Sequence, residues 1–133
     1  MTTHATGVFE VKLNPASADT PAEGAPLGRM TIDKQWHGDL DGVSTGEMLT
    51  AGSYVKGSAG YVAVERFSGT LQGRTGTFAL MHMGVMTRGT PQLTIMVVPD
   101  SGTGQLVGLT GTLMINIADG KHSYDFEYSI TLP

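Results

Sequence analysis

Nearly every apolar segment of this chain alternates apolar and polar residues at a period of two, or is a short apolar run bounded by Gly, Pro, Asp or Ser. This is the pattern of β-strands, and no stretch shows the spacing of an amphipathic helix. Nineteen glycines among 133 residues favour short strands and many turns. The pattern predicts eight strands, at residues 6–13, 28–37, 43–51, 61–68, 76–86, 92–98, 111–117 and 123–132.

Eight sequential strands with short hairpin turns can close on themselves, which removes exposed sheet edges. The sequence therefore predicts an all-β fold, a single eight-stranded antiparallel β-barrel that occupies residues 1–133 as one domain. Residues 14–27 hold three of the six prolines, so we expect a long surface loop there.

The pattern Gly-x-Leu-x-Gly occurs three times, at residues 38–42, 69–73 and 104–108. Two glycines let the backbone bend on both sides of one large side chain. We expect Leu40, Leu71 and Leu106 to fold inward and to plug one end of the barrel. A chance match in a glycine-rich chain is the alternative.

Composition excludes several classes of function. The chain has a net charge of −4 and no Lys/Arg cluster, which argues against nucleic acid as a partner. No window approaches 18 apolar residues and no basic segment precedes an apolar one at the N-terminus, so we expect no membrane span, no signal peptide and a cytoplasmic location. The absence of cysteine excludes a thiolate nucleophile, and the histidines are too scattered for a metal site, so no cofactor is expected.

Alternation places four polar side chains on faces that are otherwise apolar: Lys34, Glu47, Glu65 and His82. If these faces line the lumen, each buried group must pair, hydrogen-bond or change its pKa, because burying it unpaired costs several kcal/mol. Glu65 and His82 lie at similar distances from the turn at Gly73, so we expect them to be in contact.

Two interpretations of these groups are open. Glu65 and His82 are candidate catalytic acid/base residues, and the candidate ligand-binding residues of the lumen are Lys34, Trp36, Glu47, Tyr61 and Phe78. Alternatively, Lys34 pairs with a glutamate in a purely structural network that fixes the strand register.

The face opposite His82 carries Met81 and Met83 with other apolar residues, and residues 93–98 are apolar on both faces. A strand that is apolar inside and out lacks a solvated outer surface. We therefore expect a homo-oligomer, with a dimer favoured.

Three segments carry a resemblance to a known family: Glu65-Arg66 followed by Gly69-x-Leu-x-Gly, the strand Gly76-x-Phe-x-Leu-x-His-x-Gly84, and Ser101-Gly-Thr-Gly followed by Gly108-Leu-x-Gly111. In these the chain resembles small, mostly uncharacterised bacterial proteins with an allene-oxide-cyclase-like barrel. The resemblance implies an eight-stranded barrel, often oligomeric, with an apolar lumen. The plant enzymes that name the fold cyclise a fatty-acid epoxide, but their catalytic residues form no short motif to match here.

These observations favour a small-molecule-binding barrel whose apolar lumen takes an apolar or amphipathic ligand, with isomerase or cyclase chemistry at Glu65 and His82. The alternative is a noncatalytic oligomeric structural or accessory protein with a filled barrel. An eight-stranded barrel can be filled by side chains or can hold one small ligand, so the presence of a cavity discriminates the two.

Overall fold

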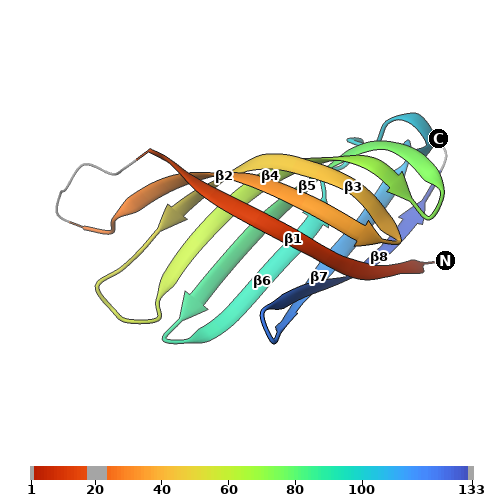
Figure 1. The fold of residues 1–133 in the computed structure, drawn as a ribbon. Helices are drawn as coiled ribbons and strands as arrows, with labels where there is room; N and C mark the ends of the chain where they lie inside the picture. Colours follow the sequence, from red (N-terminus) through yellow and green to blue (C-terminus); the bar gives the residue numbers. More distant parts are fainter. Residues whose placement is uncertain (1, 18–23, 132–133) are drawn as a thin grey trace.

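A computed structural model, which describes residues 2–17 and 24–131, shows a closed barrel of eight antiparallel strands in sequence order (Figure 1). The strands are β1 (Thr3–Ser17), β2 (Leu27–Gly38), β3 (Leu40–Ala51), β4 (Ala59–Leu71), β5 (Arg74–Thr87), β6 (Thr90–Val97), β7 (Leu109–Ala118) and β8 (Lys121–Ile130). The one helix in this part of the chain is a single 3₁₀ turn, η1 (Gly104–Leu106). The predicted fold class is thus confirmed.

Across the residues that the structure describes, no helix is long and apolar enough to cross a membrane.

The predicted loop at 14–27 needs a correction. Residues 14–17 belong to β1 and pair with β2 in an irregular register between Pro15 and Ser17. The proline stands where the pairing is already weak, because β1 pairs with β8 only as far as Phe9 and its register with β2 shifts directly after Pro15. Residues 18–23 of that loop, and the end of the predicted last strand at Leu132, lie outside the described residues.

One end of the barrel is plugged. Leu40, Leu71 and Leu106, the central residues of the three glycine-bracketed motifs, are fully buried there. Each motif has at least one glycine at positive φ, as a tight turn requires. The hydroxyl of Tyr124 accepts a hydrogen bond from the Leu40 N–H at 2.8 Å and ties the turn after β2 to β8. The predicted inward fold of these leucines is confirmed.

Aromatic rings fill the space next to this plug. Ring centroids lie 4.9 Å apart for Phe9 and Trp36, 5.0 Å for Phe67 and Phe78, and 5.8 Å for Phe78 and Phe126. All five side chains are buried, and rings at these separations contribute favourable contacts beyond their buried area. This half of the barrel is therefore a packed aromatic core.

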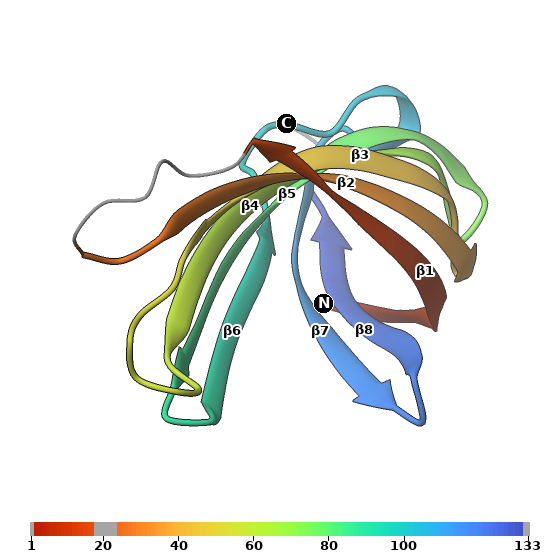
Figure 2. The same ribbon diagram turned by 60° about the vertical axis from the view of Figure 1, so that its left-hand side comes forward.

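The opposite end, which we call the mouth, is looser. The single position at which β6 and β7 pair, Met96 with Thr112, lies toward the plug, and Figure 2 shows the two strands diverging from there toward their hairpins at the mouth. By contrast, β2 to β5 pair with one another along most of their length. The barrel is therefore tightly closed at the leucine plug and splayed at the mouth.

The close approach of β3 and β4 in the middle of the barrel requires a glycine at position 46. A β-carbon at Gly46 would lie 2.1 Å from the Val64 carbonyl oxygen and 2.6 Å from the Glu65 Cα, whereas one at Gly60 would meet nothing closer than 3.7 Å. We expect Gly46→Ala to lower the free energy of unfolding by about 1–3 kcal/mol or more, because β3 and β4 must move apart. Gly60→Ala is the matched control and should change stability by less than ~0.5 kcal/mol. Urea unfolding measures both, and equal midpoints would contradict this account of Gly46.

Candidate functional site

Three charged or titratable side chains meet in the middle of the barrel. The Lys34 ammonium on β2 donates to Oε2 of Glu65 on β4 at 2.7 Å, and Nε2 of His82 on β5 lies 2.6 Å from the same oxygen. Side-chain exposure is 5% for Lys34 and His82 and 0% for Glu65. The structure thus brings together both candidate catalytic residues and the lysine. We call these three residues the ionic cluster.

Strand register explains how side chains from three strands meet. Glu65 lies opposite Leu80 and His82 lies opposite Ala63, so Glu65 and His82 are diagonal neighbours on one face. Lys34 must reach across β3, where Ser44 pairs with Lys34 and Gly46 pairs with Glu65. Because both β3 residues are small, the lysine can pass over them to the carboxylate.

The carboxyl of Glu65 is ionised in this environment. Burial alone would raise its pKa, but the hydrogen bond from His82 and the charge of Lys34 outweigh burial and hold the pKa below its ordinary value of 4.5. Since an ionised carboxylate only accepts hydrogen bonds, Nε2 of His82 carries a proton and donates it to Oε2. When the ring is neutral, Nδ1 of His82 is an acceptor.

One atom of the ionic cluster is unsatisfied. Glu65 Oε1 is buried and has no hydrogen-bond partner. A buried carboxylate oxygen without a donor is unfavourable by about 1–3 kcal/mol or more, so such atoms are rare in folded proteins. The cluster therefore has an open acceptor that a ligand or a water molecule could satisfy.

An apolar cavity of about 660 Å³ occupies the mouth. This volume is within the range of small-molecule sites. Tyr61, one of the candidate ligand-binding residues, is half-buried in its wall, and burial raises the pKa of its phenol. The lining comes from β2 to β7 and from the loop after β3: Met30, Met48, Thr50, Ala51, Gly52, Ala59, Gly60, Tyr61, Gly84, Val85, Met86, Pro91, Gln92, Leu93 and Ile117.

The ionic cluster lies directly below this cavity. Along β5 the inward residues run from Met86 at the mouth through Gly84 to His82, and along β4 from Tyr61 through Ala63 to Glu65. The Tyr61 ring lies against Gly84, where a β-carbon would come within 2.3 Å of it, and its centroid is 6.4 Å from that of His82. The Tyr61 ring therefore forms the floor between the cavity and the imidazole.

The placement predicted for Glu47 is wrong. Glu47 lies on the outer face of β3, where it accepts a hydrogen bond from Arg29 Nε at 2.6 Å, and its side chain is 54% exposed. Val43 and Leu49 on the same face are also exposed. The inward residues of β3 are Ser44, Gly46, Met48 and Thr50, most of them small or polar, so alternation of hydrophobicity points to the opposite face.

Two other candidate ligand-binding residues lie deeper than the cavity. Trp36 is fully buried among rings and donates through Nε1 to Ser44 Oγ at 2.6 Å. Phe78 is packed between Phe67 and Phe126. The sequence analysis does not identify the methionines and Leu93 of the cavity wall as ligand-binding residues. The signal that could identify them is their position on the inward faces, at the strand ends that form the mouth.

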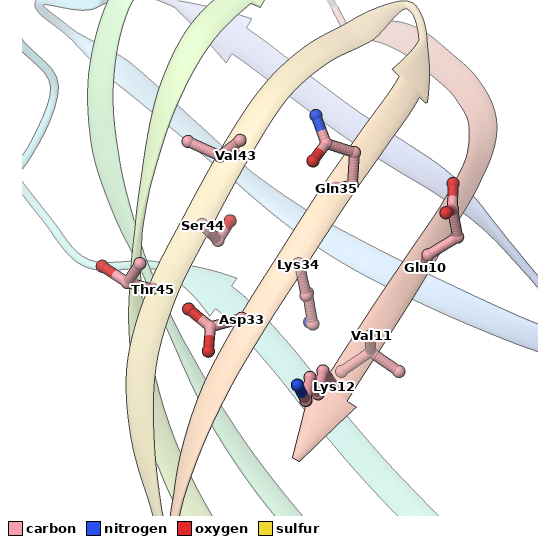
Figure 3. A pocket seen from close by; sticks show the side chains of 9 residues that line it. All are labelled: Glu10, Val11, Lys12, Asp33, Lys34, Gln35, Val43, Ser44 and Thr45. Atoms are coloured by element: carbon pink, nitrogen blue, oxygen red, sulfur yellow. The ribbon is translucent and has the colours of Figure 1, made fainter. Parts of the chain in front are cut away.

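Two further hollows lie on the outside of the barrel, with volumes of about 340 and 570 Å³. Figure 3 shows the first, where exposed side chains of both signs surround the stem of Lys34. Its ammonium is already bonded to Glu65 inside the barrel, so it is not available to a ligand in this hollow. Among the described residues, no group of three or more His, Cys, Asp or Glu side chains is placed to hold a metal ion.

The chain is similar in sequence and in fold to known proteins. Residues 5–128 match a family described as "Protein of unknown function (DUF3224)". A crystal structure of a DUF3224 protein of unknown function from Shewanella oneidensis MR-1 is 48% identical, covers all of both chains and superposes with a TM-score of 0.95. No curated protein matches the chain.

The ionic cluster makes stability depend on Glu65. We expect Glu65→Gln to lower the free energy of unfolding by about 3–5 kcal/mol at pH 7, because it leaves the buried Lys34 ammonium without its counter-charge. Glu47→Gln is the matched control, and its loss should be no more than about 1 kcal/mol, since its ion pair with Arg29 is half exposed. Urea unfolding of both variants measures the difference.

The stability difference between wild type and each of these two variants should depend on pH in a different way. Glu65 has a lower pKa when folded than when unfolded, so its contribution is complete above pH 4.5 and is lost as the pH falls below that value. The stability gap between wild type and Glu65→Gln should therefore narrow on acidification, while the gap for Glu47→Gln stays small. A gap that is constant down to pH 3 would show that Glu65 is not held ionised by the fold.

Proposed function

We propose that this chain, which belongs to the DUF3224 family, binds a small apolar or amphipathic molecule in its mouth cavity and acts on it as an isomerase or cyclase. One observation carries the proposal. A cavity of about 660 Å³ with an apolar wall lies directly above a buried Lys34–Glu65–His82 cluster that has an unsatisfied carboxylate oxygen. An apolar pocket with few convergent polar groups and a perturbed titratable residue is the usual form of a small-molecule site.

The cluster supports acid/base chemistry. His82 donates through Nε2 to Glu65, which leaves Nδ1 free to accept a proton from a ligand. The Glu65 carboxylate then stabilises the imidazolium, and Lys34 keeps that carboxylate ionised. Return of the proton from Nδ1 to another atom of the same molecule completes an isomerisation and needs no co-substrate.

The resemblance to allene-oxide-cyclase-like barrels agrees with this proposal, because those enzymes hold an apolar substrate inside the lumen. The noncatalytic alternative is supported by the packed aromatic half of the barrel and by the burial of the cluster. A ligand retained at the mouth supports the binding function, and an empty mouth supports the noncatalytic alternative.

We expect protein purified from its own host to carry a ligand that native mass spectrometry detects. Met48→Glu, which puts a charge into the apolar wall of the cavity, should abolish retention of this ligand. Met114→Glu is the matched control, because Met114 is 72% exposed and is not part of the cavity wall, and it should retain the ligand. Wild-type protein without a ligand, or retention by Met48→Glu, would contradict binding in the mouth.

A second apolar surface lies on the outside of β3 to β6. Its six large side chains are 38% to 60% exposed and lie next to one another across the strands: Leu49, Val62, Val64, Met81, Met83 and Met96. Together they present on the order of 500 Å² of apolar area, near the upper limit for a monomer and most of the ~800 Å² that each partner buries in a stable dimer. We propose that a second copy of the chain covers this face.

Size-exclusion chromatography with light scattering at micromolar concentration tests the assembly. The wild-type chain should have twice its 14.0 kDa mass, and Met83→Glu should be a monomer because it puts a charge into a desolvated contact. Asn116→Glu, an exposed position on β7, is the control and should remain associated. A wild-type mass of one chain rules out this dimer.

A further inference from the structure

The cavity wall carries no formal charge among the residues that the structure describes. Its polar side chains are Thr50, Tyr61 and Gln92, all neutral. A charged head group held in the cavity itself would lose its hydration without meeting a counter-ion, which is strongly unfavourable. The apolar wall therefore suits an uncharged molecule.

The groups beneath the Tyr61 floor determine what the polar end of such a molecule can bond to. His82 comes first on the path from the mouth, because the inward residues around it, Ala63 and Gly84, are the smallest in this part of the barrel. Glu65 lies one inward position deeper on β4. A ligand group that displaces the Tyr61 ring reaches the imidazole and then the carboxylate.

Both donor-bearing side chains of the ionic cluster bond to Glu65, and the ammonium is turned toward the aromatic core rather than the mouth. The Lys34 ammonium donates to Glu65 Oε2 and lies 4.9 and 5.1 Å from the ring centroids of Phe9 and Trp36, where cation–π attraction holds it. The Nε2–H of His82 is bonded to the same carboxylate oxygen. Lysine therefore faces away from an incoming ligand and is not an anion site.

The open positions of the cluster are both acceptors. Glu65 Oε1 is buried without a partner, and among the described residues no hydrogen bond is made by Nδ1 of His82, which accepts when the ring is neutral. A carboxylate or phosphate brought to this point would face the Glu65 charge and two acceptors. A hydroxyl or amide N–H would satisfy one of the two acceptors.

We infer that the ligand of the mouth is an uncharged, mainly apolar molecule that presents a hydrogen-bond donor, a hydroxyl or an N–H, to His82 and Glu65, and that it is not an anion. This inference rests on the proposed function and names the class of its ligand. A donor that meets Nδ1 of His82 is also the group from which the imidazole can take a proton.

Three probes of similar size test the head group: octan-1-ol, its isomer 1-methoxyheptane, which has no donor, and octanoate. Binding to wild-type protein at pH 8 is measured from the NMR shifts of the methyl groups of Met30, Met48 and Met86 in the cavity wall. We expect octan-1-ol to bind at least tenfold more tightly than octanoate and several-fold more tightly than the ether. Octanoate binding as tightly as the alcohol, or the ether binding as tightly, overturns the inference.

The outcomes separate this inference from the proposed function. If octanoate or the ether binds as well as octan-1-ol, the mouth is a ligand site and the inference alone fails. If none of the three moves the methionine methyl groups, both fail. Glu65→Gln should reduce the preference for octan-1-ol over octanoate, whereas Glu47→Gln, which changes a carboxylate on the outer face, should keep the wild-type preference.

Discussion

Glu65 Oε2 accepts hydrogen bonds from both Lys34 and His82, and this shared oxygen connects β2, β4 and β5 across the interior of the barrel. Breaking a buried pair leaves an uncompensated charge, so the three side chains must be placed together or not at all. Other features of the middle of the barrel follow from this requirement. Ser44 and Gly46 are small because the lysine passes over them, and the rings of Phe9 and Trp36 cover the rest of the ammonium.

The ionic cluster also marks the boundary between two halves with different roles. On one side, the leucine plug and the aromatic rings form the apolar core that stabilises the fold. On the other side, β6 and β7 separate and the inner face surrounds a cavity. The packed half and the pairing of β2 to β5 hold the barrel together without the mouth, which can therefore remain open. Functional sites commonly occupy such less densely packed regions.

Much of this arrangement could be predicted from the sequence, since a period of two both identifies a strand and divides its residues between two faces. Alternation identifies the inner face correctly for β2, β4, β5 and β8, where bulky apolar residues such as Trp36, Phe67 and Phe126 are on that face. It failed for β3, because the interior there accommodates Ser44 and Gly46, while the larger Val43 and Leu49 belong to the outer apolar face. For this reason alternation predicts an inward Glu47, which the structure contradicts.

The cavity could not be predicted because it depends on distances between strands rather than on faces. Alternation indicates that Tyr61, Phe78 and Trp36 all point inward. It does not indicate where along the barrel the aromatic core ends and the cavity begins, because that boundary depends on how far β6 and β7 diverge. Nor does it show that Glu65 Oε1 is left without a donor, which depends on the position of one atom. The proposed function depends on both properties. A buried acceptor beside an apolar space is stable only when the rest of the cluster holds the carboxylate in place. A site of this kind therefore requires the structural ion pair between Lys34 and Glu65. The same contact stabilises the fold and keeps the Glu65 carboxylate in position for a ligand.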